Sequence, residues 1–180
     1  MRLRKLGVLF FIASSLMLIG SPMTGFCETT GNAQPQALEH KLAADGLLRK
    51  GLTSQAILEY QKALELDPSS TAVHFNLAIV YYAERNIKGA VFALEKLVAL
   101  DPKDVEAQYN LACLSLCEKN VEKALFHLER AKACSTANSE FAPLIQNAFF
   151  FIEELKSMDG RARETVFLLL QQGLPLFSQI

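Results

Sequence analysis

Apolar residues recur along the chain at the spacing of an amphipathic α-helix. Between Ala56 and Leu66 they follow the i, i+3, i+4, i+7 pattern that places side chains on one face of a helix. Short turn-forming segments interrupt the pattern at Gly51, at Arg85-Asn86 and at Lys119-Asn120. Glycine adopts positive φ freely, and Asn tolerates it better than most residues, so these segments suit tight turns between helices. The pattern predicts an all-α protein made of short antiparallel helices.

The same residue types return every 34 positions. Alanine stands at Ala56, Ala90 and Ala124, and a large apolar or aromatic residue follows each of them four positions later. The sequence Leu-Asp-Pro closes two of the copies, at 66–68 and 100–102. Proline disfavours helical geometry in the residue before it, so each of these prolines marks a helix end. A fixed period of this length predicts stacked helical hairpins that bury apolar surface against their neighbours.

These positions resemble the tetratricopeptide repeat, whose pattern of large and small residues has a period of about 34. The resemblance covers three consecutive copies, 37–70, 71–104 and 105–138. The Trp position of the family pattern holds His or Gln here, the Gly position holds Ala, and Thr136 stands where the third copy would have Pro. The resemblance implies an all-α, right-handed superhelical array of helix-turn-helix repeats that binds peptides or proteins.

Alanine is expected where the two helices of each pair approach most closely. A larger side chain at these points would push the helix axes beyond the usual separation of about 8–10 Å. The residues concerned are Ala44, Ala78 and Ala112 on the first helices and Ala56, Ala90 and Ala124 on the second helices.

Two further helices are expected after the third copy. Apolar residues from Phe141 to Leu155 form one helical stripe, and Pro143 lies in its first turn, where proline is tolerated. The second helix, 162–172, is expected to pack back along the first. Since this pair does not match the second half of the repeat, we interpret residues 139–180 as a degenerate fourth repeat or capping helices with an apolar tail.

The N-terminus has the features of a bacterial export signal. A basic segment, 1–5, precedes fifteen uncharged residues, 6–20. Small residues follow, and cleavage after Cys27 would place Gly25 and Cys27 at the two small-residue positions of the cleavage site. We therefore expect a signal peptide over 1–27 and a location in the periplasm or envelope of a bacterium.

Two other fates of this segment stay open. A lipoprotein would carry its lipid on Cys27, although Phe26 stands where that motif has a small residue. An uncleaved segment would anchor the chain in the membrane, although Pro22 makes it a poor span. After cleavage, residues 28–36 would form a polar linker, and the rest of the chain is expected to form one compact domain.

Without its first 27 residues the chain is weakly acidic. Three of its 18 Lys and Arg residues and none of its 19 Asp and Glu residues lie in that segment, which leaves 15 basic and 19 acidic residues. A nucleic-acid-binding protein needs a basic surface that displaces counterions, and adhesion to an anionic membrane needs the same. The charge of the chain therefore argues against both functions.

The resemblance also implies which residues face a partner. In tetratricopeptide repeats the first helix of each pair lines a concave groove. By register, the partner-binding groove would contain Phe75, Ile79, Tyr82, Tyr109, Cys113 and Leu116. Lys41 and Asp45 would lie at a charged end of this groove. Its apolar middle indicates that a peptide or partner helix binds there, while the C-terminal tail and a second copy of the chain are the other occupants considered.

One subfamily, the chaperone-binding repeats, holds the C-terminal carboxylate of its ligand with basic and amide side chains. The corresponding residues here are Lys41, Asp45, Asn76, Glu106 and Asn110. Asp45 and Glu106 would repel a carboxylate, so this function is excluded. The two Asn side chains are expected to bond to neighbouring backbone instead.

The cysteines leave three interpretations open. Cys113 and Cys117 lie four residues apart on one helix, where a disulfide cannot readily close, and are expected to be buried thiols. A disulfide from Cys134, either within the chain or to another chain, suits an oxidising compartment. A redox- or metal-responsive role for Cys113, Cys117 and Cys134 is the third interpretation.

Motifs for catalysis are missing from the sequence. It has no Gly-rich phosphate loop, no HExxH motif and no nucleophile elbow, so we expect neither enzyme activity nor a metal or cofactor. His40 and His74 are expected to be hydrogen-bonded between paired helices, and His127 is expected at the boundary of the core. We interpret the protein as an exported adaptor or assembly factor that binds a protein or peptide in a preformed groove.

Overall fold

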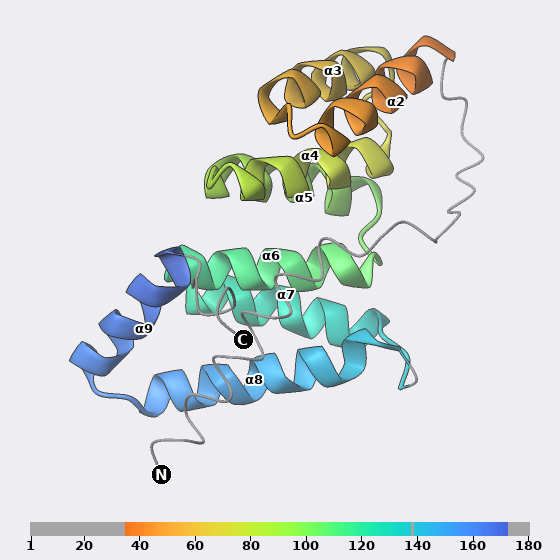
Figure 1. Cartoon of the computed structure of the whole chain (residues 1–180). Helices are drawn as coiled ribbons and strands as arrows, with labels where there is room; N and C mark the ends of the chain where they lie inside the picture. Colours follow the sequence, from red (N-terminus) through yellow and green to blue (C-terminus); the bar gives the residue numbers. More distant parts are fainter. Residues whose placement is uncertain (1–34, 138, 173–180) are drawn as a thin grey trace. The chain divides into compact units, whose positions relative to one another are not determined.

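The computed structural model describes residues 35–137 and 139–172, and every element of regular structure in these ranges is an α-helix (Figure 1). This confirms the predicted all-α class. The predicted signal peptide, most of the linker and the apolar tail lie outside the described residues. The helices are α2 (Pro35–Arg49), α3 (Thr53–Leu66), α4 (Thr71–Ala83), α5 (Ile87–Leu100), α6 (Val105–Cys117), α7 (Val121–Cys134), α8 (Phe141–Ser157) and α9 (Gly160–Gln172).

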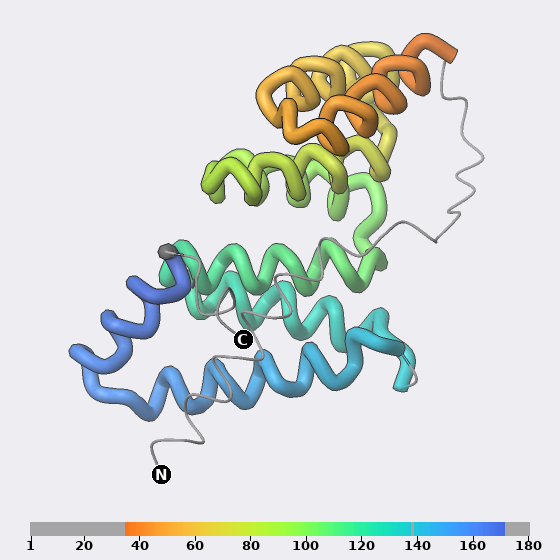
Figure 2. Tube along the Cα trace, viewed as in Figure 1, coloured from red at the N-terminus to blue at the C-terminus, as the bar shows by residue number. Residues whose placement is uncertain are grey.

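The described helices belong to two compact units that divide after Pro102, where one domain was expected. In the first unit α2 pairs with α3 and α4 pairs with α5, and α3 packs on α4. In the second unit α6 pairs with α7, α8 packs on both of them, and α9 packs on α6 (Figure 2). Three helical hairpins of the predicted kind are therefore present, each followed directly by the next helix.

The tight turns use their residues differently from the prediction. Gly51 has the expected positive φ of 73°, but in the later turns the left-handed residues are Arg85 and Lys119, with φ of 61° and 62°. Asn86 and Asn120 instead cap the helices that follow. Each of these Asn side chains accepts a hydrogen bond from the backbone N–H three residues on, at 3.0 and 2.9 Å. Asn is suited to this role because its oxygen satisfies an N–H group that has no partner within the helix.

Small residues occupy the interior of each hairpin. The six alanines expected at the close approach are all buried, with at most 4% of any of them exposed. Beside Ala90, a Cβ atom built on Gly89 of α5 would lie 2.9 Å from the ring of Tyr81 on α4. No side chain fits between these two helices at that point without movement of the aromatic ring.

A carboxylate is buried where α2, α3 and α4 meet. Asp45 accepts hydrogen bonds from the Tyr60 hydroxyl at 2.5 Å and from Asn76 Nδ2 at 3.1 Å. Its second oxygen accepts a bond from Lys41 Nζ at 2.8 Å. Burial, together with the hydrogen bond to Asp45, raises the pKa of Tyr60, so its hydroxyl remains a donor. A buried charge is tolerated only when it is bonded in this way, and the network thereby joins the first hairpin to the second.

The last helix does not pack back along α8 as predicted. Gln171 Nε2 of α9 donates a hydrogen bond to the Cys117 carbonyl of α6 at 3.0 Å, and Arg163 donates to the final carbonyls of α8. Helices α8 and α9 therefore meet at their shared end and diverge from it (Figure 1). The position 34 residues after Ala124 is Met158, in the turn before α9. Helix α9 thus has no alanine where a close hairpin requires one.

Replacing Tyr60 with Phe tests the buried network. Tyr60→Phe removes one donor to Asp45 with little change in volume, so the free energy of unfolding should fall by about 1–3 kcal/mol. Urea denaturation of the chain from residue 28 measures this. Tyr81→Phe is the matched control because the Tyr81 hydroxyl accepts its hydrogen bond from the exposed side chain of Gln61, and it should change stability by less than about 0.5 kcal/mol. Equal losses in both variants would contradict the role given to Asp45.

Candidate functional site

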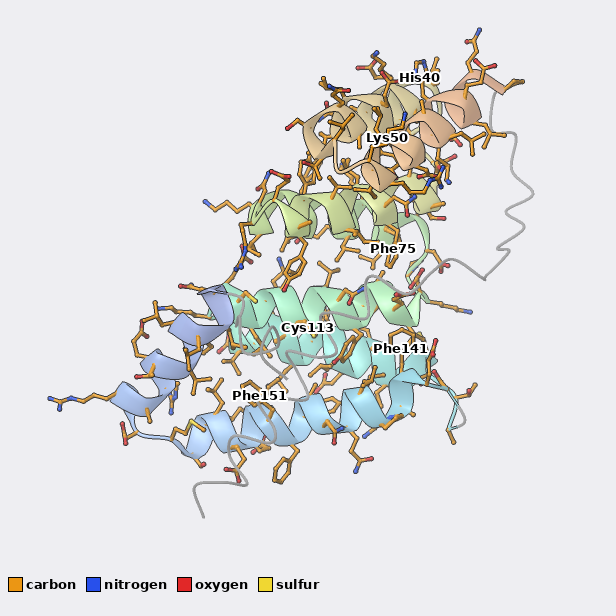
Figure 3. All side chains as sticks on the ribbon, in the orientation of Figure 1. His40, Lys50, Phe75, Cys113, Phe141 and Phe151 are labelled. Carbon is orange, nitrogen blue, oxygen red and sulfur yellow. The ribbon has the colours of Figure 1, made fainter. Side chains whose placement is uncertain are left out.

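The first half of the predicted groove lies on one face of α4. Phe75, Ile79 and Tyr82 are spaced four and three residues apart, so they project from the same side of the helix. All three are half-buried, which leaves part of each apolar side chain in contact with solvent. Figure 3 shows Phe75 near the start of this helix. These three residues form a partly exposed apolar and aromatic strip on α4, and their role in binding a partner stays a prediction.

The second half of the predicted groove is inside the second unit. Tyr109, Cys113 and Leu116 of α6 are each at most 2% exposed. The Tyr109 ring packs against Phe141 of α8 with 5.9 Å between ring centroids, and α9 bonds the C-terminal end of α6. The expected exposure of these three residues is wrong because α8 and α9 fold against the helix that carries them. A partner can contact the α4 strip but not these side chains.

The charged end of the predicted groove is compensated within the chain. Lys41 and Asp45 form an ion pair one helical turn apart, and Asp45 itself is buried. Asn76 also bonds Asp45, where a bond to neighbouring backbone was expected. Lys41 and Asn76, the two residues that could have held a ligand carboxylate, therefore already bind one from their own chain.

The described cysteines are free thiols. Cys113 and Cys117 are buried and Cys134 is half-buried. Burial raises the pKa of the Cys113 thiol to about 12 and that of the Cys117 thiol to about 11. Because the thiolate is the form that attacks disulfides and binds metals, both α6 thiols are poorly reactive at neutral pH. Within 35–137 and 139–172, no three His, Cys, Asp or Glu side chains cluster as a metal site.

Histidines occur at hydrogen-bonded positions between helices. His40 Nδ1 lies 2.6 Å from Glu59 on α3, and His74 Nε2 lies 3.1 Å from a backbone carbonyl oxygen, as expected for packed histidines. Burial lowers the pKa of His74. His127 is buried, where a boundary position was expected, and it bonds Gln108 Oε1 at 2.8 Å. Gln108 stands at the Trp position of the repeat, and its side chain is the hydrogen-bond partner of the buried His127 imidazole.

Glu106, at the start of α6, is the acid with the most altered ionisation. Burial raises its pKa to about 7, with further contributions from the charges of Asp104 and Glu140. The carboxyl is therefore partly protonated near neutral pH. Sequence reasoning noted Glu106 only as an acid unsuited to a carboxylate ligand, and its burial depends on packing that the local sequence does not reveal.

Comparison with known families agrees with the hairpin geometry. Residues 71–104 match the family described as Tetratricopeptide repeat, and residues 45–84 match the family described as TPR repeat. Residues 45–104 are tetratricopeptide repeats. The resemblance inferred from the 34-residue period is thus confirmed for this part of the chain.

Solved structures with the same fold include three peptide or chaperone complexes. The first tetratricopeptide domain of Spaghetti (RPAP3), bound to the HSP90 peptide SRMEEVD, aligns with 68% of this chain and 94% of its own, at TM-score 0.59 and 21% identity. The Yersinia enterocolitica type III secretion chaperone SycD, with a peptide of the translocator YopD, aligns with 67% and 94% at TM-score 0.58 and 18% identity. The TPR2B domain of yeast Sti1, in a pHsp70 complex, aligns with 66% and 97% at TM-score 0.59 and 20% identity. These likenesses show a helical-repeat fold.

A sequence relative comes from Pseudomonas aeruginosa. The type IV pilus assembly protein PilF is 35% identical over 85 residues, which is 42% of this chain and 33% of PilF. The chain therefore matches about a third of the length of this relative. Among the residues that the structure describes, no helix combines the length and apolar character needed to cross a membrane.

The ionisation of Glu106 predicts a pH-dependent stability. Folding raises the pKa of this carboxyl from an ordinary value of 4.5 to about 7, so the fold favours the neutral form. This contribution is fully present below pH 4.5 and is lost as the pH rises through 7. Glu106→Gln should be more stable than the wild type by about 1–3 kcal/mol at pH 8, with no such gain at pH 4. Chemical denaturation at both pH values checks this. Exposed Glu122 provides the control Glu122→Gln, and an equal gain there would contradict the prediction.

Proposed function

We propose that this chain is an exported protein-interaction module that acts as an adaptor or assembly factor in a bacterial envelope. Its partner is a protein segment, either an extended peptide or a helix, and it performs no catalysis. The observation that carries the proposal is the apolar strip of Phe75, Ile79 and Tyr82 on a repeat helix that leaves these side chains partly exposed. Adjacent apolar and aromatic side chains that solvent reaches on one helix face are typical of an interaction surface.

Peptide recognition by related folds supports this proposal. Two of the similar structures hold peptides, from HSP90 and from the translocator YopD. A preformed groove on stacked hairpins loses little conformational entropy on binding, so a few aromatic anchors supply useful affinity. The α4 strip offers two such anchors, Phe75 and Tyr82, with Ile79 between them.

The ligand need not end in a free carboxylate. Lys41 and Asn76 bond Asp45 at 2.8 and 3.1 Å, and a second carboxylate at this point would face the negative charge of Asp45. We therefore propose that recognition depends on apolar side chains of the partner. This distinguishes the chain from repeats that hold the C-terminal carboxylate of a chaperone.

Export and a role in assembly rest on the N-terminal segment and on the PilF likeness. The basic residues and apolar stretch of 1–20 have the order of a signal peptide. The relative PilF is described as a type IV pilus assembly protein, and the likeness over 85 residues supports a role in assembly for this chain. The alternative is the same array tethered to the membrane by a lipid on Cys27.

The redox- or metal-responsive alternative is weakened by packing. Cys113 and Cys117 would have to leave the core of the second unit before they could react, and burial suppresses their thiolates. Cys134 is the described thiol nearest to solvent, and one thiol does not make a metal site.

Alanine substitution in the α4 strip tests the binding function. The double variant Phe75→Ala, Tyr82→Ala should reduce the yield of the main protein crosslinked to the full chain in its native cells by roughly tenfold, because it removes both aromatic anchors. Quantitative mass spectrometry of the captured proteins provides the measurement. The matched control is Leu58→Ala, Phe92→Ala, which removes two exposed apolar side chains from α3 and α5 of the same unit. Unchanged capture by the α4 variant, with helicity retained, would refute the proposal.

The mature N-terminus tests export. Intact-protein mass spectrometry of the envelope fraction should show a chain that begins at Glu28 and carries no lipid. A diacylated N-terminal Cys27 would establish the tethered alternative. Recovery of the chain from the cytoplasm with residues 1–27 still attached would contradict both.

A further inference from the structure

The first helix of each hairpin presents the same repeat positions to its second helix. Position 4 of the repeat is His40 in α2, which bonds Glu59 of α3, and Gln108 in α6, which bonds His127 of α7. Position 11 is Tyr81 in α4, whose ring contacts the site of Gly89 in α5. These two positions therefore mark the face that a second helix covers.

Helix α8 continues the register, but its corresponding face is open. Ala142 and Phe149 stand 34 residues after Gln108 and Ser115, at positions 4 and 11 of the repeat. Both line a cavity of about 530 Å³ between α8 and the C-terminal end of α7. We call this cavity the α8 pocket; its other lining residues are Lys132, Ser135, Thr136, Ala137, Ile145, Gln146, Phe150 and Glu153. Helix α9, which follows α8 in sequence, does not cover this face because it packs against α6.

The exposed fractions of matching residues show the missing cover. Phe150, which lines the α8 pocket, is 56% exposed. Gln146 is exposed, whereas Ala112 at its repeat position is buried. Large apolar side chains therefore line a face that solvent reaches in the second unit.

Two charged side chains, Lys132 and Glu153, line the α8 pocket. Lys132 Nζ lies 5.6 Å from the centroid of the Phe149 ring, and among the described residues it pairs with no carboxylate. The acid at the other end of the pocket, Glu153, is bonded to Lys156 at 3.0 Å. A ligand that brings an apolar surface and a negative charge would complement both the aromatic floor and the free ammonium.

We propose that the α8 pocket binds an acidic amphipathic α-helix of another protein, in the place that a second helix occupies in the other hairpins. Such a helix would set its apolar stripe on Phe149 and Phe150 and direct an Asp or Glu towards Lys132. The helices α3, α5 and α7 that cover the equivalent faces each have 14 residues, so a helix of about four turns fills the pocket.

The described helices of a second copy offer no suitable occupant. The contact faces of α3, α5 and α7 are buried in their own hairpins, at Ala56, Ala90 and Ala124. Val166 and Phe167 of α9 are buried as well. We assign the site to a helix of a different protein, and this surface is separate in sequence and in unit from the α4 strip to which the proposed function assigns peptide binding.

Site-specific photocrosslinking in the native cells tests this assignment on the full chain. A benzophenone amino acid replaces Phe150 in one variant and Phe126 in another. Phe126 is the matched control because it is an exposed Phe, 53% against 56%, on α7 outside the pocket. We expect a product with another protein from position 150 and none from position 126. Mass spectrometry should place the crosslink in a partner segment with apolar residues at i, i+3 or i+4, and i+7 and a neighbouring Asp or Glu.

Charge reversal provides the second arm. Lys132→Glu should reduce the yield of that crosslinked product by roughly fivefold or more. The substitution replaces the attraction between Lys132 and an acidic residue of the partner helix by repulsion. Lys96→Glu is its control, since Lys96 likewise lies over a Phe ring, 5.3 Å from the Phe92 centroid, away from the pocket. The α4 double variant should leave the yield unchanged, so failure of this proposal and failure of the proposed function remain distinguishable.

Five outcomes would overturn the assignment. They are a product of two copies of this chain, a crosslink within one copy, a partner segment without the apolar and acidic pattern, equal yields from positions 126 and 150, and no product at all. Circular dichroism checks that each variant is folded before crosslinking. Both variants should fold, because the side chains of Phe150 and Phe126 are exposed.

Discussion

Each hairpin depends on the close approach of its two antiparallel helices at buried alanine residues. Ala56, Ala90 and Ala124 are almost completely buried, and only a methyl group fits where the helix axes are nearest. This contact lets the larger apolar residues on either side interdigitate. After α8 the corresponding repeat position falls at Met158, in the turn before α9, and the last helix packs on a different neighbour.

Buried polar groups add specificity to this packing. Asp45 bonds residues of α2, α3 and α4, and Gln108 bonds His127 across the third hairpin. In the described part of the chain no buried side-chain nitrogen or oxygen lacks a partner. Each bond forms in one register only, and a slipped register would leave a polar group buried without a partner, at a cost comparable to that of a lost hydrogen bond. Apolar contacts alone would tolerate such slippage better.

The position of the last two helices decides which surfaces the protein offers. Because α8 and α9 cover α6, the apolar residues of that helix stabilise the second unit and do not face a partner. Because α9 turns away from α8, aromatic residues of α8 are left beside an open pocket. The two units therefore present different surfaces. The first has an apolar strip on α4, and the second has a pocket between α8 and Lys132 of α7.

The sequence by itself determined the helices, their pairing within the three repeats and the aligned apolar face of α4. These follow from the spacing of apolar residues and alanines within a few turns of helix, which is a local property. One register predicted exposure for both sets of residues, yet Phe75, Ile79 and Tyr82 are half-buried whereas Tyr109, Cys113 and Leu116 are buried. Only the tertiary structure decided that difference, the burial of His127 and the pocket beside Phe149. Whether a helix face is covered depends on where a segment distant in the chain packs, and α9 reaches α6 through contacts that no local pattern records.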